Sequence, residues 1–397
     1  MNLSKNPCIL IIGGGIIGLS LARELHIKGV RKITILERGK IGGEATSAAA
    51  GMLAPQAEAE KPDNFFHFCS DSKNLYINFA DQLFAETGVD IELDRNGTLY
   101  LAFSEADVME IRRRYDWQKK AGLAVEHLSA EEVRKAEPFV SPDVREALFF
   151  PNDWQVENRK LLIALQKYAE LNCIEIVEDA EVKNLLTENG KAIGAETSDK
   201  KFFAETTVLA TGAWTSFIKS GENALCLPKV KPIRGQMLSF KTAKRLFSKV
   251  IYSPRGYIVP RFDGRILIGA TVEDAGFDKN ITISGINFLL ETASEISPNL
   301  ANLEIFDKWA GLRPFASDGS PILGAIPEIE NLFIATAHFR YGILLAPLTA
   351  KILAEKIVEN LDSKYLEIFS PSRFQTKKEN LGINITIPLR VNTDKHR

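Results

Sequence analysis

The feature that most constrains this chain is a glycine-rich turn set between apolar strands and a helix near its start. Residues 8–12 are wholly apolar, as in a strand buried on both faces of a parallel sheet, and they lead into Gly13-Gly14-Gly15-Ile16-Ile17-Gly18. Apolar residues then recur at helical spacing, and a second apolar run, 32–36, ends at Glu37. A G-x-G-x-x-G motif predicts a dinucleotide site when it lies in this strand–turn–helix–strand context.

Each of three glycines of the motif has a physical role. Gly13 permits the tight turn, Gly15 lets a pyrophosphate approach the backbone, and Gly18 lets the helix pack closely on the sheet. The helix N-terminus then offers unpaired N–H groups and its positive dipole to the phosphates. Glu37 stands where a carboxylate accepts hydrogen bonds from an adenosine ribose. The alternative is a glycine-rich turn of another α/β fold, with Glu37 a solvated strand end.

Composition narrows the class of protein. A chain of 397 residues predicts two or three domains. A net charge of −2 gives no electrostatic argument for binding nucleic acid or an anionic membrane surface. The four cysteines lie far apart without a C-x-x-C pair, which predicts neither a metal site nor a redox pair. No apolar run is long enough to span a bilayer, so we expect a cytoplasmic protein without a membrane span.

Two further stretches of small residues fit a large planar ligand. The run 42–55 is mostly Gly, Ala, Ser and Thr, too small for an ordinary core helix and too apolar for a solvated linker. Small side chains let a backbone lie flat against a cofactor ring; the alternative is a tightly packed, alanine-rich helix start. A strand predicted over 202–209 runs into Ala210-Thr211-Gly212-Ala213, where Thr211 and Gly212 would pass under the adenosine diphosphate half.

The remaining pattern predicts a second region. An apolar stripe of helical spacing covers 65–84, a helix covers 159–172 and a strand covers 174–182. From about residue 226 short alternating strands, with a turn at Asp263-Gly264, indicate an antiparallel sheet inserted into the nucleotide fold. Pro347 fits only near the first turn of a helix, so the last long helix should begin at 342–345.

Eight segments resemble one family, the flavin-dependent amine oxidases of the D-amino acid oxidase superfamily, and among them the glycine oxidases. These segments are CILIIGGGIIG at 8–18, GEATSAAAGMLAPQAE at 43–58, VLATGAW at 208–214, PIRGQML at 232–238, YIVPR at 257–261, ILIGATVED at 266–274, WAGLRP with DGSPILG in 309–324, and HFRYGILLAP at 338–347. They spread over nearly the whole chain to about residue 360.

The resemblance implies an α/β (α+β) fold, in which an antiparallel-sheet substrate domain is inserted into a Rossmann-like domain that holds noncovalent FAD. The FAD-binding domain would comprise 1–90, 150–225 and 310–368, the substrate domain 91–149 and 226–309, and a C-terminal tail 369–397.

The implied reaction is oxidation of glycine, or of small amines such as sarcosine or D-alanine. Its products are glyoxylate or another 2-oxo acid, ammonia and hydrogen peroxide, and the glycine imine would supply thiazole synthesis for thiamine. The alternatives are a D-amino acid dehydrogenase, a sarcosine-oxidase-like enzyme, a nicotinamide dehydrogenase and a non-catalytic flavoprotein. The partners would be the amine and oxygen, and homo-oligomerisation stays open.

By the resemblance, Arg313 corresponds to the arginine that binds the substrate carboxylate, Arg340 to a second arginine there, and Tyr257 to a tyrosine facing that carboxylate. No catalytic residue is obligatory, because a neutral amine needs no general base, and His338 is interpreted as structural. Together with the residues singled out above, the predicted cofactor set is Gly13, Gly15, Ile16, Ile17, Gly18, Glu37, Arg38, Ala45, Thr46, Ala50, Gly51, Met52, Val182, Thr211, Gly212, His338, Phe339, Arg340, Tyr341, Gly342, Ile343 and Leu344.

The chain departs from the family pattern at three positions. Ala337 stands where the family has glycine, Tyr341 where it has asparagine, and Phe315 where it has a small residue. If Phe315 and Tyr341 point inward, their bulk predicts a small substrate pocket.

Overall fold

The computed structural model describes residues 8–220 and 227–374. Its first layer is a six-stranded sheet whose strands are parallel apart from the edge strand β19, which pairs antiparallel with β20. In spatial order the strands are β19 (Ile322–Ala325), β20 (Leu332–Thr336), β12 (Thr206–Leu209), β1 (Cys8–Ile12), β2 (Lys32–Leu36) and β8 (Glu175–Val177). The predicted strands 8–12 and 32–36 are confirmed, and β1 lies between β12 and β2.

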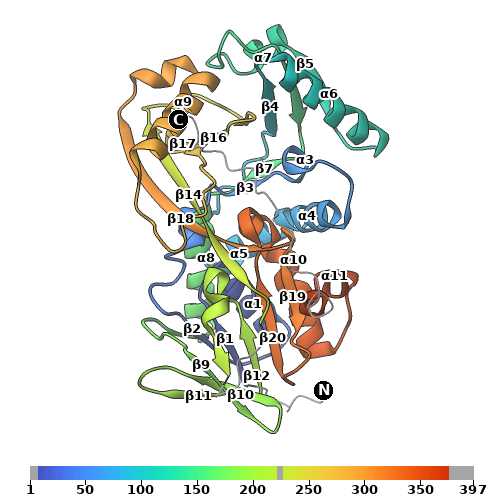
Figure 1. Cartoon of the computed structure of the whole chain (residues 1–397), viewed down its shortest axis with the longest axis vertical. Helices are drawn as coiled ribbons and strands as arrows, with labels where there is room; N and C mark the ends of the chain where they lie inside the picture. Colours follow the sequence, from blue (N-terminus) through green and yellow to red (C-terminus); the bar gives the residue numbers. More distant parts are fainter. Residues whose placement is uncertain (1–7, 221–226, 375–397) are drawn as a thin grey trace, which may run out of the picture.

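The second large sheet has eight strands. Figure 1 shows its strands β4, β5, β16 and β17 in the upper part of the molecule. In order these are β18 (Ile305–Ala316), β14 (Val230–Lys241), β17 (Arg265–Gly269), β16 (Tyr257–Pro260), β15 (Val250–Tyr252), β4 (Thr98–Ala102), β6 (Glu146–Phe150) and β5 (Glu126–Ser129). The sheet expected after residue 226 is therefore present, and three strands from 98–150 extend it. The β15–β4 pair is parallel, so the sheet is mixed rather than purely antiparallel.

The remaining strands form two small sheets. One has the order β11 (Lys201–Phe203), β10 (Lys191–Glu196), β9 (Asn184–Glu188), β13 (Lys219–Ser220), and the other pairs β3 (Met52–Leu53) with β7 (Trp154–Gln155). The single strand predicted over 202–209 is wrong, because β11 pairs with β10 whereas β12 pairs with β1. The strand predicted over 174–182 is shorter than expected and ends at Val177.

The helices match the sequence periodicity in most places. They are α1 (Ile16–Ile27), α2 (Ala45–Ala48), α3 (Pro55–Glu58), α4 (Asn64–Asn74), α5 (Tyr76–Thr87), α6 (Glu105–Lys120), α7 (Ala130–Ala136), α8 (Asn158–Leu171), α9 (Ile283–Ile296), α10 (Gly342–Glu359) and α11 (Lys364–Ile368). The stripe over 65–84 is divided into α4 and α5, because the N–H of Leu75 bonds to the carbonyl of Ser72 and tightens the turn.

Helix α10 begins at Gly342, within the predicted range 342–345, but Pro347 lies inside the helix and not in its first turn as expected. Proline has no N–H, so it cannot bond to the carbonyl four residues earlier, which here belongs to Ile343. The buried hydroxyl of Tyr76 donates to that carbonyl instead. A side chain from α5 therefore satisfies the group that proline leaves without a helical partner.

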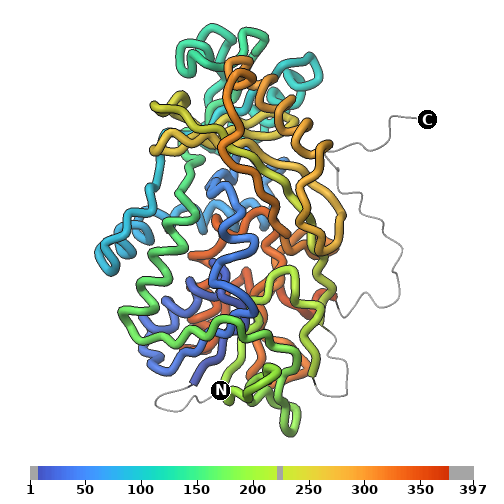
Figure 2. Tube along the Cα trace, turned by 90° about the vertical axis from the view of Figure 1, so that its left-hand side faces the viewer, coloured from blue at the N-terminus to red at the C-terminus, as the bar shows by residue number. Residues whose placement is uncertain are grey.

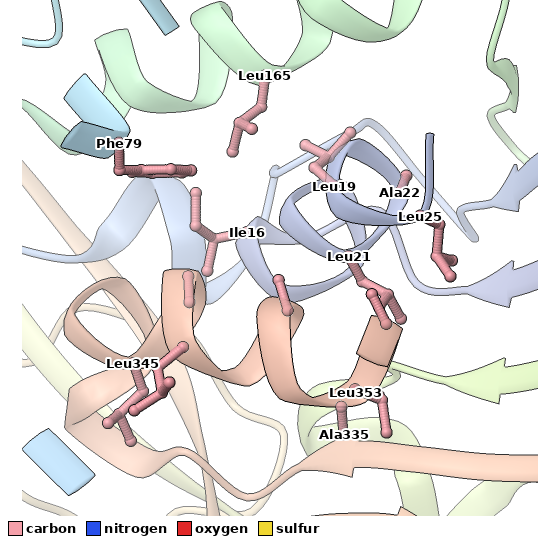
Figure 3. Close-up of a cluster of buried hydrophobic side chains, with 14 of the residues drawn as sticks. Ile16, Leu19, Leu21, Ala22, Leu25, Phe79, Leu165, Ala335, Leu345 and Leu353 are labelled. Atoms are coloured by element: carbon pink, nitrogen blue, oxygen red, sulfur yellow. The ribbon is translucent and has the colours of Figure 1, made fainter. Parts of the chain in front are cut away.

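The core around the glycine turn is built on α1 (Figure 3). Leu19, Leu21 and Leu25 are at most 2 % exposed and lie between α10 on one side and α8 on the other. The close approach of α1 to β1 depends on Gly18, where a Cβ atom would lie 2.0 Å from the carbonyl oxygen of Gly13. The predicted packing role of Gly18 therefore has a direct steric reason.

The two ends of the molecule are formed by different segments. Figures 1 and 2 both show α6 and α7 at one end and the β9–β11 strands at the other.

Across residues 8–220 and 227–374, none of the helices combines the length and apolar character that crossing a bilayer requires. The division into two discontinuous domains stays a prediction, and most of the predicted tail, 375–397, lies outside the described residues, as does Cys226.

Candidate active site

A cavity of about 780 Å³ runs between the two large sheets. Its wall is formed by the β1–α1 turn, the small-residue segment 42–54, the end of β12, the facing strands β14 and β18, and residues 335–344. The size is that of a pocket for a large organic ligand. The small residues of 42–54 thus face a ligand-sized space, as predicted, although four of them also form the short helix α2.

The structure brings together nearly all of the predicted site residues. Arg313, Arg340 and Tyr257 line the cavity, and so does every member of the predicted cofactor set apart from Gly18. Gly18 does not line the cavity; it lies where α1 packs against the sheet.

The glycine turn leaves space on the cavity side at one position. A Cβ on Gly13 would meet the Ala210 carbonyl oxygen at 2.3 Å, and one on Gly14 would meet the Ile41 side chain at 2.2 Å. A Cβ on Gly15 has only the Thr46 hydroxyl nearby, at 3.3 Å. Gly15 is the N-cap of α1, where the N–H of Ile16 donates to the Thr46 hydroxyl at 2.9 Å. This electropositive helix terminus lines the cavity and fits a pyrophosphate.

Glu37 is fixed at the end of β2 by the backbone. Its carboxylate accepts hydrogen bonds from the N–H of Gly14 at 2.8 Å and from the N–H of Gly39 at 3.0 Å. Each oxygen keeps a further lone pair, and Glu37 lines the cavity. This geometry supports the predicted contact with ribose hydroxyls.

The same end of the cavity holds an aromatic platform that the sequence reasoning did not assign. The Arg38 guanidinium lies 3.7 Å from the centroid of the Trp214 ring, and it also pairs with Glu44 at 2.6 Å. All three residues line the cavity. The signal for Trp214 was its place directly after Ala-Thr-Gly-Ala at the end of a strand.

Arg313 is held on the opposite side, on β18. Its Nη1 donates to the carbonyl of Thr271 at 3.0 Å, and burial lowers the pKa of the guanidinium, which still stays charged. The ion pairs found among the described residues do not include Arg313. A guanidinium that lines a cavity and donates to main-chain carbonyl oxygens is suited to receive an anionic group of a ligand.

Gly235 makes room for that guanidinium. In the β14–β18 register Gly235 pairs with Gly311, two residues from Arg313, and a Cβ at 235 would lie 2.2 to 2.4 Å from the guanidinium atoms. For the FAD-dependent amine oxidation that the sequence resemblance implies, we predict that Gly235→Ala displaces the Arg313 side chain and raises KM for the amine at least tenfold, about 1.4 kcal/mol, while FAD content is unchanged. Steady-state kinetics with a flavin absorbance ratio test this, and an unchanged KM would show that Arg313 does not bind substrate from this position.

Arg340 and Tyr341 lie beside the start of α10 and share one carboxylate. The Nη1 of Arg340 lies 3.1 Å from Oε2 of Glu58, to which the Tyr341 hydroxyl donates at 3.3 Å, and the Tyr252 hydroxyl donates to Oε1. Burial would lower the pKa of Arg340, but Glu58 outweighs it and raises the pKa. Glu58 was not singled out from the sequence, where it ends the matching segment GEATSAAAGMLAPQAE.

The three departures from the family pattern differ in position. Tyr341 lines the cavity as expected, whereas Phe315 does not; its ring packs edge-on against Phe339, with centroids 5.1 Å apart. The expectation that Phe315 narrows the pocket is therefore wrong. Ala337 has a φ of +59°, a left-handed conformation that glycine adopts more readily.

His338 is enclosed beside the cavity. Its Nε2 lies 3.2 Å from the hydroxyl of Thr349, and burial lowers the pKa of the imidazole to about 3. The ring is therefore neutral throughout the physiological range. This supports the structural interpretation over an acid–base role.

The same shift predicts a pH-dependent stability. The folded pKa lies below the unfolded value of about 6.5, so the unfolded chain gains a proton that the folded protein excludes, and stability falls as pH drops from 6.5 towards 3. We expect the wild type to lose about 2 kcal/mol more than His338→Asn in the free energy of unfolding between pH 6.5 and 5. Urea unfolding at both pH values measures this; parallel losses in the two proteins would contradict it.

The glycine turn, the Glu37 carboxylate and Arg313 line one cavity, an arrangement suited to a dinucleotide cofactor beside an anionic substrate. The family model described as "FAD dependent oxidoreductase" matches residues 8–356. The chain therefore belongs to the family of FAD-dependent oxidoreductases, and FAD is its cofactor.

Within that family the chain is similar to glycine oxidases. It is 35% identical over 367 residues to the glycine oxidase of Bacillus subtilis (strain 168), covering 92% of this chain and 96% of the relative. The crystal structure of glycine oxidase from Geobacillus kaustophilus superposes with a TM-score of 0.87 at 32% identity, covering 93% of this chain and 99% of that one. A bifunctional protein ThiO/ThiG from Synechocystis is 35% identical over 374 residues. The match covers 93% of this chain and 54% of that longer protein.

Proposed function

We propose that this FAD-dependent oxidoreductase oxidises glycine and other small amines to the 2-oxo acid, ammonia and hydrogen peroxide. The observation that carries the proposal is Arg313, a charged guanidinium in the cofactor cavity whose hydrogen bonds go to main-chain carbonyls. It can bind the carboxylate of an amino acid. The similarity to glycine oxidases over nearly the full length of both chains supports the choice of glycine.

The roles of the residues follow from their places. Arg313 would hold the substrate carboxylate through two N–H groups, which fixes orientation as well as adding energy. Tyr257 lines the cavity beside it, and its predicted hydrogen bond to the carboxylate stays part of the proposal. When bound, FAD supplies the acceptor for two electrons. Gly342 and Ile343, in the first turn of α10, would place the positive helix end towards it.

The proposal extends to the setting of the enzyme. The glycine-derived imine would feed thiazole synthesis for thiamine, which the similarity to a bifunctional ThiO/ThiG protein supports. Oxygen would be the electron acceptor. We also infer a cytoplasmic location, supported by the free state of the described cysteines Cys8, Cys69 and Cys173.

An anaerobic flavin-reduction panel tests the reaction. Glycine, sarcosine and D-alanine should bleach the flavin, D-phenylalanine should hardly do so, and admitting oxygen should restore the colour with formation of peroxide. Faster reduction by D-phenylalanine would favour a general D-amino acid enzyme. Reduction without rapid reoxidation by oxygen would favour a dehydrogenase, and no reduction by any amine would favour a non-catalytic flavoprotein.

Noncovalent attachment of FAD is a separate prediction. Within the described part of the chain no cysteine lines the cavity, so no thiol there is placed to tether the flavin ring. Precipitation with acid should leave all the yellow colour in the supernatant. Colour in the washed pellet would show a covalent link.

A further inference from the structure

The two arginines at the substrate end of the cavity differ in their electrical surroundings. Arg313 donates to main-chain carbonyls. Arg340 faces the carboxylate of Glu58, with 3.1 Å between Nη1 and Oε2. The Arg340 side chain keeps 32% of its surface exposed and lines the cavity. Arg340 is therefore within reach of a ligand, but its charge is already balanced.

Glu58 is held in place by groups from two other segments, β15 and residues 339–341. It lies at the end of α3 and is 11% exposed. The hydroxyls of Tyr252 on β15 and Tyr341 next to α10 both donate to it, alongside Arg340. Burial and the Glu58 carboxylate both raise the pKa of Tyr341 well above its usual range, so this phenol keeps the proton that it donates. Three donors therefore hold the Glu58 carboxylate in place and turned towards Arg340.

We propose that Glu58 is a positioning residue that makes the enzyme selective for amines with one carboxylate, because it forms a direct ion pair with Arg340, whereas Arg313 has no ion pair among the described residues and stays available for the substrate carboxylate. The inference rests on the proposed function. A second carboxylate on the substrate would approach Arg340 and meet the negative charge of Glu58. A neutral side chain at 58 would instead free a guanidinium that can bind it.

A matched pair of substrates isolates this effect. Sarcosine and iminodiacetate are both N-substituted glycines, and they differ by the second carboxylate. We expect the wild type to favour sarcosine, and Glu58→Gln to raise the ratio of kcat/KM for iminodiacetate over sarcosine about ten- to hundredfold, the gain from a hydrogen bond to a charged group. The change should come mainly from a lower KM for iminodiacetate.

Arg340 must be needed for the gain. In the double variant Glu58→Gln/Arg340→Met the ratio should return to within about twofold of the wild type. Glu58→Asp, which keeps the charge, should leave the ratio low. Calorimetric titration with malonate and acetate gives a readout without turnover: malonate should gain affinity over acetate in Glu58→Gln alone.

Glu110→Gln is the matched control. Glu110 on α6 also accepts from two arginines, Arg113 and Arg114, at 2.8 Å, and it does not line the cavity. Its removal should not change the ratio of kcat/KM for iminodiacetate over sarcosine.

Glu58→Ala is prepared in parallel with Glu58→Gln, so that whichever neutral variant retains FAD is used.

The outcomes separate this inference from the proposed function. If the wild type oxidises glycine and sarcosine but the ratio in the FAD-loaded neutral variants stays unchanged, the inference is wrong and the function stands. A gain that persists without Arg340 would also overturn it. If no amine reduces the wild-type flavin, the proposed function fails first.

Discussion

Arg313→Ala should lose about 30- to several-thousand-fold in kcat/KM for glycine. Removing one partner of a desolvated, hydrogen-bonded charge pair costs about 2–5 kcal/mol, and each 1.4 kcal/mol is about a factor of ten. Much of the loss should appear in KM, because the carboxylate is bound in the ground state and the transition state alike. Steady-state kinetics and anaerobic flavin reduction measure it.

Two milder variants grade the same interaction. Arg313→Lys keeps the charge but not the fork of donors, so its activity should lie between those of the wild type and Arg313→Ala. Tyr257→Phe removes one hydrogen bond to a charged group, about 1.5–3 kcal/mol, and should be milder than Arg313→Ala. The flavin spectrum should stay intact in all three. If Arg313→Ala keeps the wild-type KM for glycine, Arg340 becomes the candidate for the carboxylate contact.

Gly15→Val should abolish FAD binding in a folded protein. The backbone at Gly15 has φ −79° and ψ −177°, which valine adopts without strain. A Cβ there meets only the Thr46 hydroxyl at 3.3 Å, so the valine side chain would occupy the space that the pyrophosphate needs. Flavin content after gel filtration, together with far-ultraviolet circular dichroism, measures the result.

Gly18→Ala is the contrasting variant. Its Cβ would lie 2.0 Å from the Gly13 carbonyl oxygen, so it should destabilise the α1–β1 contact and lower the unfolding temperature of the protein itself. Gly15→Val should leave secondary structure in place. A folded Gly15→Val protein with normal FAD content would show that this turn is not the phosphate site.

The sequence predicted correctly those secondary-structure elements that are determined by residues close together in the chain. The apolar run 8–12, the glycine turn and the apolar run 32–36 with Glu37 defined the phosphate end of the site. Pro347 predicted a helix that begins at 342–345, and α10 begins at Gly342, although Pro347 then lies inside the helix. In each case the information lies within a few residues, because hydrogen-bonding capacity, φ preference and side-chain periodicity are properties of the chain itself.

The sequence-based predictions were wrong where contacts with residues distant in the chain determine the structure. The run 202–209 reads as one strand, yet β11 and β12 pair with different sheets. The bulk of Phe315 predicted a narrowed pocket, but its ring packs on Phe339. The apolar character of a residue predicts that it will be buried. Which residues it packs against is determined by the neighbouring elements.

What the sequence by itself determined is the cofactor turn, the strand and helix that carry it, and Arg313 as a candidate for the substrate carboxylate. Only the tertiary structure decided which charges balance there. Glu58 and Arg340 are 282 residues apart in the chain and meet at 3.1 Å, and Gly235 makes room for Arg313 across the β14–β18 pair. The charge of a buried site depends on which distant groups the packing of the elements brings within hydrogen-bond distance, and no short stretch of sequence contains that information.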